Sequence, residues 1–479
     1  MSDLRVGDEA AILELRRLLD AAGYTVEGVP RALGLDGAFT RESAEIPYYV
    51  RLLPPGEPIS ALVKLFLLDV PVERGDAAAA LAPLGLDRAE RMGLVASAGD
   101  EVRGLVDLVP REELLVASDR FHDDRLPERP DHVYGPTPPT RALASLTVRQ
   151  PVESALDLGT GSGIQAILAA AHAERVVGVD VNPRALLFAR FNAIANGVSN
   201  LELREGDLFD PVEGERFDLI VCNPPYLIAP SEGYVFRDSG IRGDRFCEEL
   251  VRRVPAYLTE GGLAHVLVSW TPEPGEDPSA APRRWVEGSG CDAICLRYLA
   301  FSPLGHAAQW NRTLLGDPDA YGEALDRWVG WYREQGIEEI AWGAIVLRRR
   351  QGRNWVWAGS PPGERVVRAD HHVLRILATQ DFLARGPELL DERLVAAPDA
   401  LLGLTFRLEG GGGVVDRALL RLDGGLAFEV GVDSPTIEVL RGLDGSRPLR
   451  DVLGADDTFA AAALPVVRRL LELGLVVRG

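Results

Sequence analysis

Apolar residues near the start of the chain recur at helical spacing. Ile12, Leu15 and Leu19 fall on one face of the stretch EAAILELRRLLDAAG, as expected for an amphipathic helix. Gly23 is a natural place for that helix to end. Further along, residues 59–110 read as short helices followed by apolar strands around a polar Ala-Gly-Asp turn. That order is typical of a winged-helix module.

The hydrophobic pattern changes between residue 152 and about residue 270. Short apolar runs rich in β-branched residues are separated there by helical patterns. The runs read VESALDLG, RVVGVDV, LELREGD, FDLIVCNPPY and GGLAHVLVSW. Strands that alternate with helices in this way predict an α/β fold with a largely parallel sheet.

The rest of the chain predicts a second small module. Residues 319–335 form a helical pattern, and 337–350 and 355–357 suggest a hairpin around the turn QGRN. From Asp370 the sequence gives a helix, strands broken by glycines, further helices and a short last strand, which again favours a winged-helix-like module. With a proline-rich and charged boundary near residue 131, the predicted domains are 1–130, 131–360 and 370–479.

Composition limits the classes of protein to which the chain can belong. Its 479 residues are 46% apolar and 26% charged, which excludes a disordered or fibrous chain. With 51 basic and 72 acidic residues the net charge is −21, which argues against a large phosphate-binding surface. Only four cysteines are present, no Cys/His spacing resembles a zinc site, and no apolar run approaches the ~18 residues of a membrane span. We expect a cytoplasmic protein with no metal, no disulfide framework and no membrane partner.

A glycine-rich turn follows the first of the predicted strands. The sequence DLGTGSG begins at Asp157 and leads into the helical pattern IQAILAAAHA. Glycines let the backbone approach a ligand closely, and the amides at a helix start favour an anionic group. Asp180 closes the next strand, where a carboxylate can accept hydrogen bonds from ribose hydroxyls. This pattern alone fits either an adenosyl or a nicotinamide cofactor.

The sequence Asn-Pro-Pro-Tyr at residues 223–226 comes directly after the predicted strand FDLIVC. Ligands of open parallel sheets bind outside the carboxyl ends of the strands, so this motif and the glycine turn should face one crevice. The prolines stiffen the turn and leave the Asn223 side-chain oxygen and the Pro224 carbonyl free to accept hydrogen bonds. Two such acceptors hold a planar NH2 group, on which Tyr226 could stack.

The two motifs, in this order and spacing, make residues 133–270 resemble the class I S-adenosylmethionine-dependent methyltransferases. The resemblance is to the NPPY group, which methylates exocyclic amines of bases or the side-chain amide of glutamine. It implies a Rossmann-like central domain, S-adenosylmethionine as cofactor and direct methyl transfer without a metal. The cofactor residues that it implies are Asp157, Gly159, Thr160, Gly161, Gly163, Asp180 and Asp207. The catalytic residues that it implies are Asn223, Pro224, Pro225 and Tyr226.

Within this group the loop at 157–163 would hold the methionine part of the cofactor, Asp180 its ribose and Asp207 its adenine amine. The segment VYGPTPPT looks like the part of protein-glutamine members that closes over cofactor and substrate. Those members carry an acidic residue before threonine where this chain has Pro139 and Thr140, which leaves any role of Thr140 open.

Three substrates remain possible at this point, and all are macromolecules or peptides. We rank an exocyclic base amine in RNA first, the glutamine amide of a protein second and peptide tailoring third. The predicted winged-helix-like modules favour a macromolecule, and the C-terminal pattern is also similar to PqqD-like modules that hold precursor peptides. The arginines at 348–353 could bind nucleic acid, although a solvated hairpin tip is the simpler interpretation, and His371-His372 suggests a surface or capping pair. The oligomeric state stays open.

Overall fold

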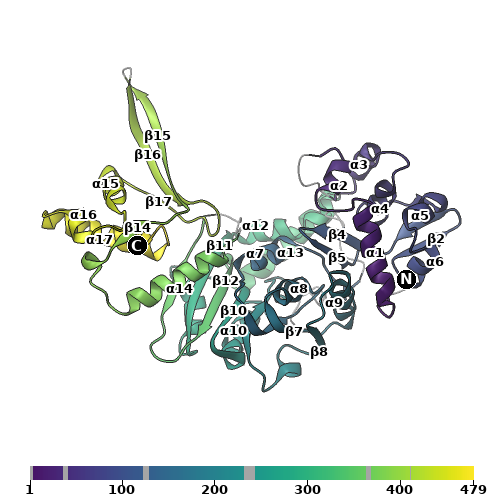
Figure 1. The fold of residues 1–479 in the computed structure, drawn as a ribbon, viewed down its shortest axis with the longest axis horizontal. Coiled ribbons are helices and arrows are strands. Elements are labelled where there is room, and N and C mark those ends of the chain that lie inside the picture. The colour runs from purple at the N-terminus through teal and green to yellow at the C-terminus, as the bar shows by residue number, and fades with distance from the viewer. Residues whose placement is uncertain (1–3, 36–40, 122–128, 231–242, 363–367, 410–411) are drawn as a thin grey trace.

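The computed structural model describes residues 4–35, 41–121, 129–230, 243–362, 368–409 and 412–479. Figure 1 shows an elongated molecule in which the N-terminal helices and the C-terminal elements lie at opposite ends of a central sheet. Part of the predicted linker, residues 122–128, and the glycines at 410–411 lie outside the described residues. Among the described residues, no helix combines the length and apolar character needed to cross a bilayer.

The central sheet has eight strands, and five neighbouring strands in it are parallel. In sheet order the strands are β13 (Val356–Gly359), β11 (Cys291–Phe301), β12 (Ile340–Arg349), β10 (Leu258–Trp270), β9 (Phe217–Cys222), β6 (Val152–Leu158), β7 (Ala173–Asp180) and β8 (Leu201–Glu205). The chain runs outward from β6 to β8 and then returns to β9 on the other side of β6. This reversal creates the crevice at which open α/β sheets bind ligands. The predicted Rossmann-like fold is confirmed.

Helices cover both faces of this sheet. Along β6, Leu156 and Leu158 pack toward α10, while Ala155 packs toward α8, because successive side chains of a strand point to opposite faces. The helices of this region are α7 (Pro138–Leu146), α8 (Ile164–Ala170), α9 (Pro183–Ala195), α10 (Gly243–Arg253), α11 (Ala280–Val286), α12 (Pro303–Trp310) and α13 (Pro318–Glu334), with short 3-10 turns at Asp210–Val212, Val254–Tyr257 and Arg312–Leu314.

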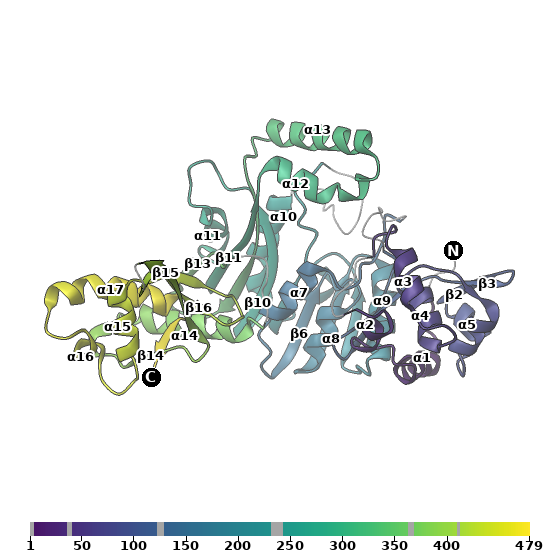
Figure 2. The ribbon, with the colours of Figure 1, turned by 90° about the horizontal axis from the view of Figure 1, so that it is seen from above.

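The helices α12 and α13 are inserted between β11 and β12. Figure 2 shows them beyond one end of the long central strands. Trp270, the last residue of β10, pairs with Ala341 at the start of β12, so the insertion lies at the carboxyl edge of β10. The helix predicted at 319–335 is confirmed as α13. Trp328 and Tyr332 of that helix are buried in a cluster with Ile228.

The hairpin predicted for residues 337–357 is wrong. β11 lies between β12 and β13 and pairs antiparallel with the first and parallel with the second. The turn QGRN therefore leads the chain past β11 to the far edge of the sheet. An apolar strand offers no local signal of which neighbour it will pair with. Here β13 pairs with β11, which lies farther away in the sequence than β12.

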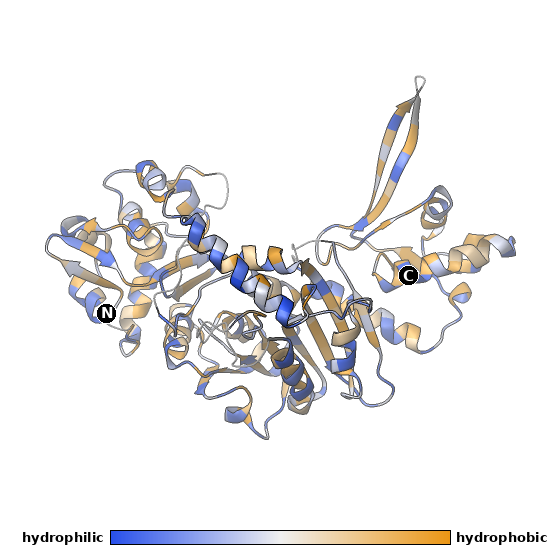
Figure 3. Cartoon of the chain, turned by 180° about the vertical axis from the view of Figure 1, so that it is seen from behind, coloured by the Kyte–Doolittle hydropathy of each residue, from blue (hydrophilic) through white to orange (hydrophobic). Residues whose placement is uncertain are grey.

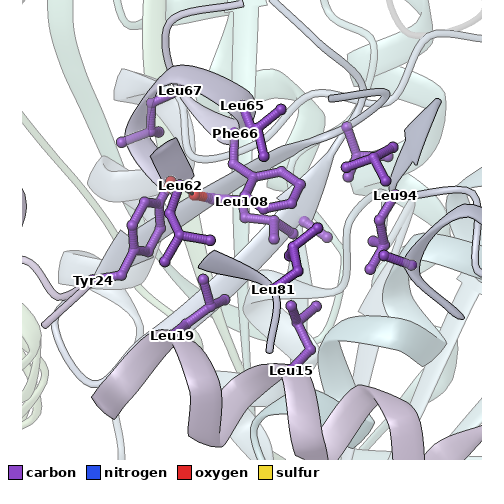
Figure 4. Packing of buried hydrophobic residues seen from close by; sticks show 14 of the residues in the cluster. Leu15, Leu19, Tyr24, Leu62, Leu65, Phe66, Leu67, Leu81, Leu94 and Leu108 are labelled. Atoms are coloured by element: carbon purple, nitrogen blue, oxygen red, sulfur yellow. Dashed lines mark hydrogen bonds between the residues drawn. The ribbon is translucent and has the colours of Figure 1, made fainter. Parts of the chain in front are cut away.

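The N-terminal segment is built of helices and two small antiparallel sheets. Its elements are α1 (Glu9–Ala21), α2 (Gly28–Ala32), α3 (Ile46–Leu52), α4 (Pro58–Phe66), β1 (Val72–Glu73), α5 (Arg74–Ala80), α6 (Leu86–Arg91), β2 (Val95–Ala98), β3 (Glu101–Gly104), β4 (Asp107–Arg111) and β5 (Leu114–Ser118). The helix predicted from Glu9 is confirmed, and Asp8 caps it by accepting a hydrogen bond from the N–H of Ala11 at 3.0 Å. Figure 4 shows Leu15 and Leu19 of this helix facing Leu62 and Leu81 across the core.

The C-terminal segment follows the predicted order of helix, strands, helices and last strand. Its elements are α14 (Asp370–Ala384), a 3-10 turn (Leu389–Asp391), β14 (Leu394–Ala396), β15 (Ala400–Glu409), β16 (Gly412–Leu422), β17 (Glu429–Gly431), α15 (Ser434–Gly442), α16 (Leu449–Leu453), α17 (Asp457–Glu472) and β18 (Val476–Arg478). β14 pairs with β18, and β15, β16 and β17 form a separate antiparallel sheet. The β15–β16 hairpin projects away from the body (Figure 1).

Both outer segments share their cores with the central one. Phe188 and Phe191 of α9 belong to the N-terminal hydrophobic cluster. Leu143 of α7 and Leu267 of β10 belong to the C-terminal cluster. Burial of this kind stabilises by about 25 cal/mol per Å² of apolar surface, so both junctions contribute to folding.

Candidate active site

Strand register brings the two sequence motifs together. Leu158, at the end of β6, is the Cα partner of Cys222 at the end of β9. Gly159 and Asn223 therefore leave neighbouring parallel strands at the same edge. Asp180 ends β7, which pairs with β6 on its other side. The glycine loop, the acidic residue and the NPPY motif thus surround one crevice, as their positions after three strands predicted.

The glycine loop has a backbone that only glycine adopts readily. Gly159, Gly161 and Gly163 have φ angles of 71°, 54° and 83°, a region unfavourable for other residues. A Cβ atom at Gly163 would lie 3.0 Å from the Cα atom of Ala189 on α9, whereas Cβ atoms at the other two glycines would meet nothing within 4 Å. The third glycine therefore serves close packing, and the first two leave room for a ligand.

Asp157 and Thr160 hold the shape of this loop. Asp157 is buried, and its Oδ2 atom accepts hydrogen bonds from the Thr160 hydroxyl at 2.7 Å and from the N–H of Ala166 at 2.9 Å. Burial raises the pKa of Asp157 to about 7, because the charged form loses its hydration. These two side chains therefore bind each other and α8, and they fix the shape of the loop.

Asp180 binds the loop and keeps acceptor capacity to spare. Its two carboxylate oxygens accept one hydrogen bond each, from the N–H of Gly161 at 2.8 Å and of Asn182 at 2.9 Å. Burial raises the pKa of Asp180. A carboxylate offers about four lone-pair positions, so two remain for ribose hydroxyls. Asp207 lies two residues beyond β8, is exposed, and its carboxylate forms no hydrogen bond with a described residue.

The NPPY turn presents two unused acceptors. The Asn223 side chain and the Pro224 carbonyl form no hydrogen bond with any residue that the structure describes. Tyr226 is partly buried, and its ring centroid lies 6.1 Å from that of Trp342 in an edge-on contact. Burial raises the pKa of Tyr226 far above its usual value, so its hydroxyl stays protonated.

Two buried hydroxyls support this turn from outside the motif. The Ser269 hydroxyl, near the end of β10, donates to the carbonyl of Tyr226. The Tyr332 hydroxyl on α13 donates to the carbonyl of Ile228 at 2.9 Å and lies 2.7 Å from Nδ1 of His306. Sequence reasoning missed these residues. Ser269, one residue before the end of the apolar run GGLAHVLVSW, was the one visible signal, since a polar residue there lies at the same sheet edge.

Helix α7, which precedes β6, is hydrogen-bonded to α8, the helix that follows the glycine loop. Thr137 caps α7, and its hydroxyl lies 2.9 Å from that of Thr140. The Thr140 carbonyl accepts a hydrogen bond from the Gln165 side chain on α8 at 2.8 Å. The Thr140 side chain therefore has a capping partner inside its own turn, which gives it a structural use.

The arginine cluster is not the solvated tip that we expected. Arg348 and Arg350 form ion pairs with Asp292, which is fully buried, and with Asp381 on α14. Trp355 also donates its indole N–H to Asp381 at 3.1 Å. The cluster joins the central sheet to the C-terminal segment, so neither arginine is available as a nucleic-acid contact.

One group of side chains has the composition of a metal site. His371, His372 and Asp399 lie close together. However, Nδ1 of His372 accepts the N–H of Leu426 at 2.9 Å, its Nε2 lies 2.7 Å from Asp399, and Arg375 donates to Asp399 at 2.8 Å. Burial lowers the pKa of His372 to about 4. Both ring nitrogens are used and a cation already occupies the carboxylate, so this cluster does not fit a metal. The expectation of a surface pair is wrong for His372, which is buried.

Comparison with known proteins identifies two family regions. The small methyltransferase domain family matches residues 138–269. A domain of unknown function, DUF7059, matches residues 21–105. The first match contains every motif of the candidate site.

Three relatives are similar to the central part of the chain. A Methanocaldococcus jannaschii protein, named as a protein N5-glutamine methyltransferase, is 34% identical over 145 residues, which are 29% of this chain and 72% of that protein. The release factor glutamine methyltransferase of Cereibacter sphaeroides is 38% identical over 26% of this chain and 50% of its own. The ribosomal protein uL3 glutamine methyltransferase of Bordetella pertussis is 36% identical over 32% and 55%. This chain thus spans about half the length of the latter two.

The residues at the crevice fit the cofactor of this family. The open space above Gly159 and Gly161 and the spare acceptors of Asp180 suit an adenosyl ligand with a positively charged sulfur. This fit and the similarity to the Methanocaldococcus protein together identify the family of the chain. The chain belongs to the class I S-adenosylmethionine-dependent methyltransferases of the NPPY group, with a small methyltransferase domain and S-adenosylmethionine as methyl donor.

Proposed function

We propose that the protein methylates the side-chain amide nitrogen of a glutamine in a protein substrate. The pair of unused acceptors at Asn223 and Pro224 supports transfer to a planar NH2 group, because it matches two N–H groups. The names of the relatives support a glutamine amide as the group that carries this nitrogen. The sequence alone ranked an RNA base amine first. The relatives are named as glutamine methyltransferases, and their names favour the second-ranked substrate.

The proposed mechanism requires placement more than acid–base chemistry. When bound, S-adenosylmethionine supplies an activated methyl group, and the residues at the crevice place the nucleophile in line with it. Asn223 Oδ1 and the Pro224 carbonyl would accept both N–H bonds of the substrate amide and turn its lone pair toward the cofactor. These acceptors also stabilise the positive charge that develops on nitrogen. Pro225 stiffens the turn, and Tyr226 would stack on the flat amide.

The cofactor would be held by the glycine loop and two acidic residues. We assign the methionine part to the backbone of residues 157–163, the ribose to Asp180 and the adenine amine to Asp207. Asp157 and Thr160 act through the shape of the loop, because their side chains bind each other and α8.

The arginine cluster gives no support to the RNA alternative. Arg348 and Arg350 are engaged with buried and half-buried carboxylates, and the net charge of −21 opposes extended contact with phosphates. An RNA base amine would still satisfy the same two acceptors, so it stays the competing outcome of the test below. Peptide tailoring ranks third.

We propose winged-helix-like modules at 1–130 and 370–479 around the methyltransferase domain at 131–360. The N-terminal elements follow the order α4, β1, α5, α6, β2, β3, with β3 between the other two strands. A helix, strand, two helices and a hairpin in this order support that proposal. Modules of this kind commonly hold a macromolecule, which agrees with a protein substrate.

The test is transfer of a tritiated methyl group from labelled cofactor into extract fractions. Extract from cells that lack this gene supplies unmethylated substrate and is separated into protein and RNA before the enzyme is added. We expect label in protein and none in RNA, and loss of that label with Asn223→Ala. Label in RNA alone would overturn the proposal and restore the base amine.

A further inference from the structure

The β15–β16 hairpin exposes an unusual amount of apolar surface. Seven of the fifteen large apolar side chains exposed in the described part of the chain belong to it. They are Leu401, Leu402, Leu404, Phe406, Leu408, Val414 and Val415. Phe406 is 54% exposed and Leu408 is 87% exposed. Figure 3 shows apolar and polar residues alternating along this projecting element, β15 and β16 (Ala400–Glu409 and Gly412–Leu422), which we name the arm.

The register gives the arm two different faces. Leu402 and Leu404 lie opposite Leu420 and Ala418, and Phe406 lies opposite Val415, so these residues share one apolar face. At the base of this face Leu420 and Ala418 are buried, whereas the side chains of β15 beyond them are open.

The second face carries arginines. Arg417 lies opposite Thr405, and Arg421 lies opposite Leu401. Neither of these exposed arginines forms an ion pair with a described residue, whereas Arg407, farther out on the same face, pairs with Asp416. The arm holds three arginines and two acidic residues, Glu409 and Asp416, so its net charge is +1 in a chain whose net charge is −21.

One edge of the arm is also free. β15 pairs only with β16, so its outer edge has no strand along residues 400–409 within the described part of the chain. A long exposed edge is a ready template for another strand. A two-stranded hairpin alone is marginally stable in water. A partner strand would add main-chain hydrogen bonds and would bury exposed apolar side chains of the arm.

We propose that the arm docks an extended segment of the protein substrate, which adds as a strand to the free edge of β15. The segment's alternate side chains are apolar and acidic, so that one set covers Phe406 and Leu404 while the other meets Arg417 and Arg421. This inference rests on the proposed function, because it takes the substrate to be a protein. The docking site lies away from the methyl-transfer crevice, and it would supply binding energy remote from the reacting nitrogen.

Other occupants fit less well. A lipid surface cannot satisfy the unpaired main-chain groups of the β15 edge, because hydrocarbon offers them no hydrogen-bond partner. A second copy of the chain carries the same net charge of −21, which opposes self-association at low salt. An extended protein segment satisfies the edge, the apolar face and the arginines together.

The test measures binding of a fluorescent decapeptide of alternating valine and glutamate by anisotropy, without methyl transfer. We expect Leu404→Ser combined with Phe406→Ser, and separately Arg417→Glu, to weaken binding at least tenfold. The matched control, Leu13→Ser with Val26→Ser, removes exposed apolar side chains at the far end of the molecule and should leave binding unchanged. S-adenosylhomocysteine affinity, measured for every variant, reports whether the fold is intact.

Two further peptides test the mode of docking. A valine–lysine alternation should bind at least tenfold more weakly because its charges meet arginine. A valine–glutamate peptide N-methylated at every residue should also bind at least tenfold more weakly, since it can donate no main-chain hydrogen bond along either edge. Equal binding of all peptides, or no effect of the arm variants, would overturn the inference. Arm-dependent dimerisation in sedimentation, or arm-dependent binding to phosphatidylserine vesicles with no peptide binding, would overturn it in favour of those occupants.

The outcome is separable from that of the proposed function. Peptide binding to the arm requires neither cofactor nor chemistry, so label in RNA together with arm-dependent peptide binding would reject the glutamine substrate and keep the docking site. Label in protein without any effect of the arm variants on KM would keep the protein substrate and reject the docking site. Where both hold, the Leu404 and Phe406 variant should raise KM for the protein substrate at least fivefold with kcat unchanged.

Discussion

The hydroxyl of Thr160 lies 2.7 Å from Oδ2 of Asp157, and the same oxygen accepts the N–H of Ala166. One buried carboxylate thus joins the middle of the glycine loop to the first turn of α8. Its burial raises the pKa of Asp157 to about 7. The glycine loop is therefore shaped by a group whose protonation changes near neutral pH.

This pKa predicts how stability depends on pH. Between about pH 4 and pH 7 the folded protein holds a proton on Asp157 that the unfolded chain has released, so the free energy of unfolding falls as pH rises through this window. Asp157→Asn can keep both hydrogen bonds through its single amide oxygen and removes the titration. In urea unfolding at pH 5 and pH 8, we expect the wild type to lose about 3 kcal/mol more than the variant. Equal losses would show that Asp157 does not titrate in this range.

Asp180 should control cofactor affinity. Asp180→Ala leaves the N–H groups of Gly161 and Asn182 without their acceptor and removes the proposed ribose contact, so S-adenosylhomocysteine binding should weaken by about 1–3 kcal/mol in calorimetry. The matched control is Glu205→Ala, because Glu205 is the exposed Cα partner of Asp180 on β8. A similar loss of affinity in both variants would contradict the assignment.

Asn223 should separate binding from chemistry. Asn223→Ala removes an acceptor for the substrate amide, so we expect kcat to fall by at least about a hundredfold while S-adenosylhomocysteine affinity changes less than twofold. Parallel loss of both quantities would mean that Asn223 shapes the cofactor site instead.

Ser269 should act through the NPPY turn. Ser269→Ala leaves the Tyr226 carbonyl without its donor, which costs about 1–2 kcal/mol for a buried group. We expect kcat to fall about tenfold and the free energy of unfolding to fall by no more than this amount, with cofactor affinity little changed. A large stability loss with unchanged kcat in the remaining folded protein would show a purely structural role.

Arg348 should matter for stability and not for nucleic acid. Arg348→Ser removes one of the two arginines paired with the fully buried Asp292 and leaves Arg350 in place. We therefore expect a loss of about 1–2 kcal/mol, less than the ~3 kcal/mol of a buried charge left unpaired. Urea unfolding measures this loss, with Arg353→Ser as the control from the adjoining turn. Salt-dependent RNA binding that disappears with Arg348→Ser in folded protein would contradict this role.

The sequence predicted the parts of the fold whose signals are local. The apolar runs that became β6 to β10, the amphipathic spacing of α1 and the glycines with positive φ all carry their structure within a few residues. The NPPY motif indicated its place because it follows an apolar strand, and parallel strands end at one edge.

The features that escaped prediction depend on contacts distant in sequence. β13 passes β11 to reach the sheet edge, Arg348 meets Asp381 from another segment, and Ser269 meets Tyr226. No periodicity within those stretches indicates such partners. The arm was visible as strands, but its exposure follows only from the absence of a described neighbour along β15.

The most direct test of the account identifies the methylated atom. Protein and RNA labelled by the wild-type enzyme are digested fully with enzymes, and the labelled products are identified by mass spectrometry. The account predicts N5-methylglutamine from protein, absent when Asn223→Ala replaces the wild type. Labelled methylated bases from RNA, with no methylglutamine, would contradict it.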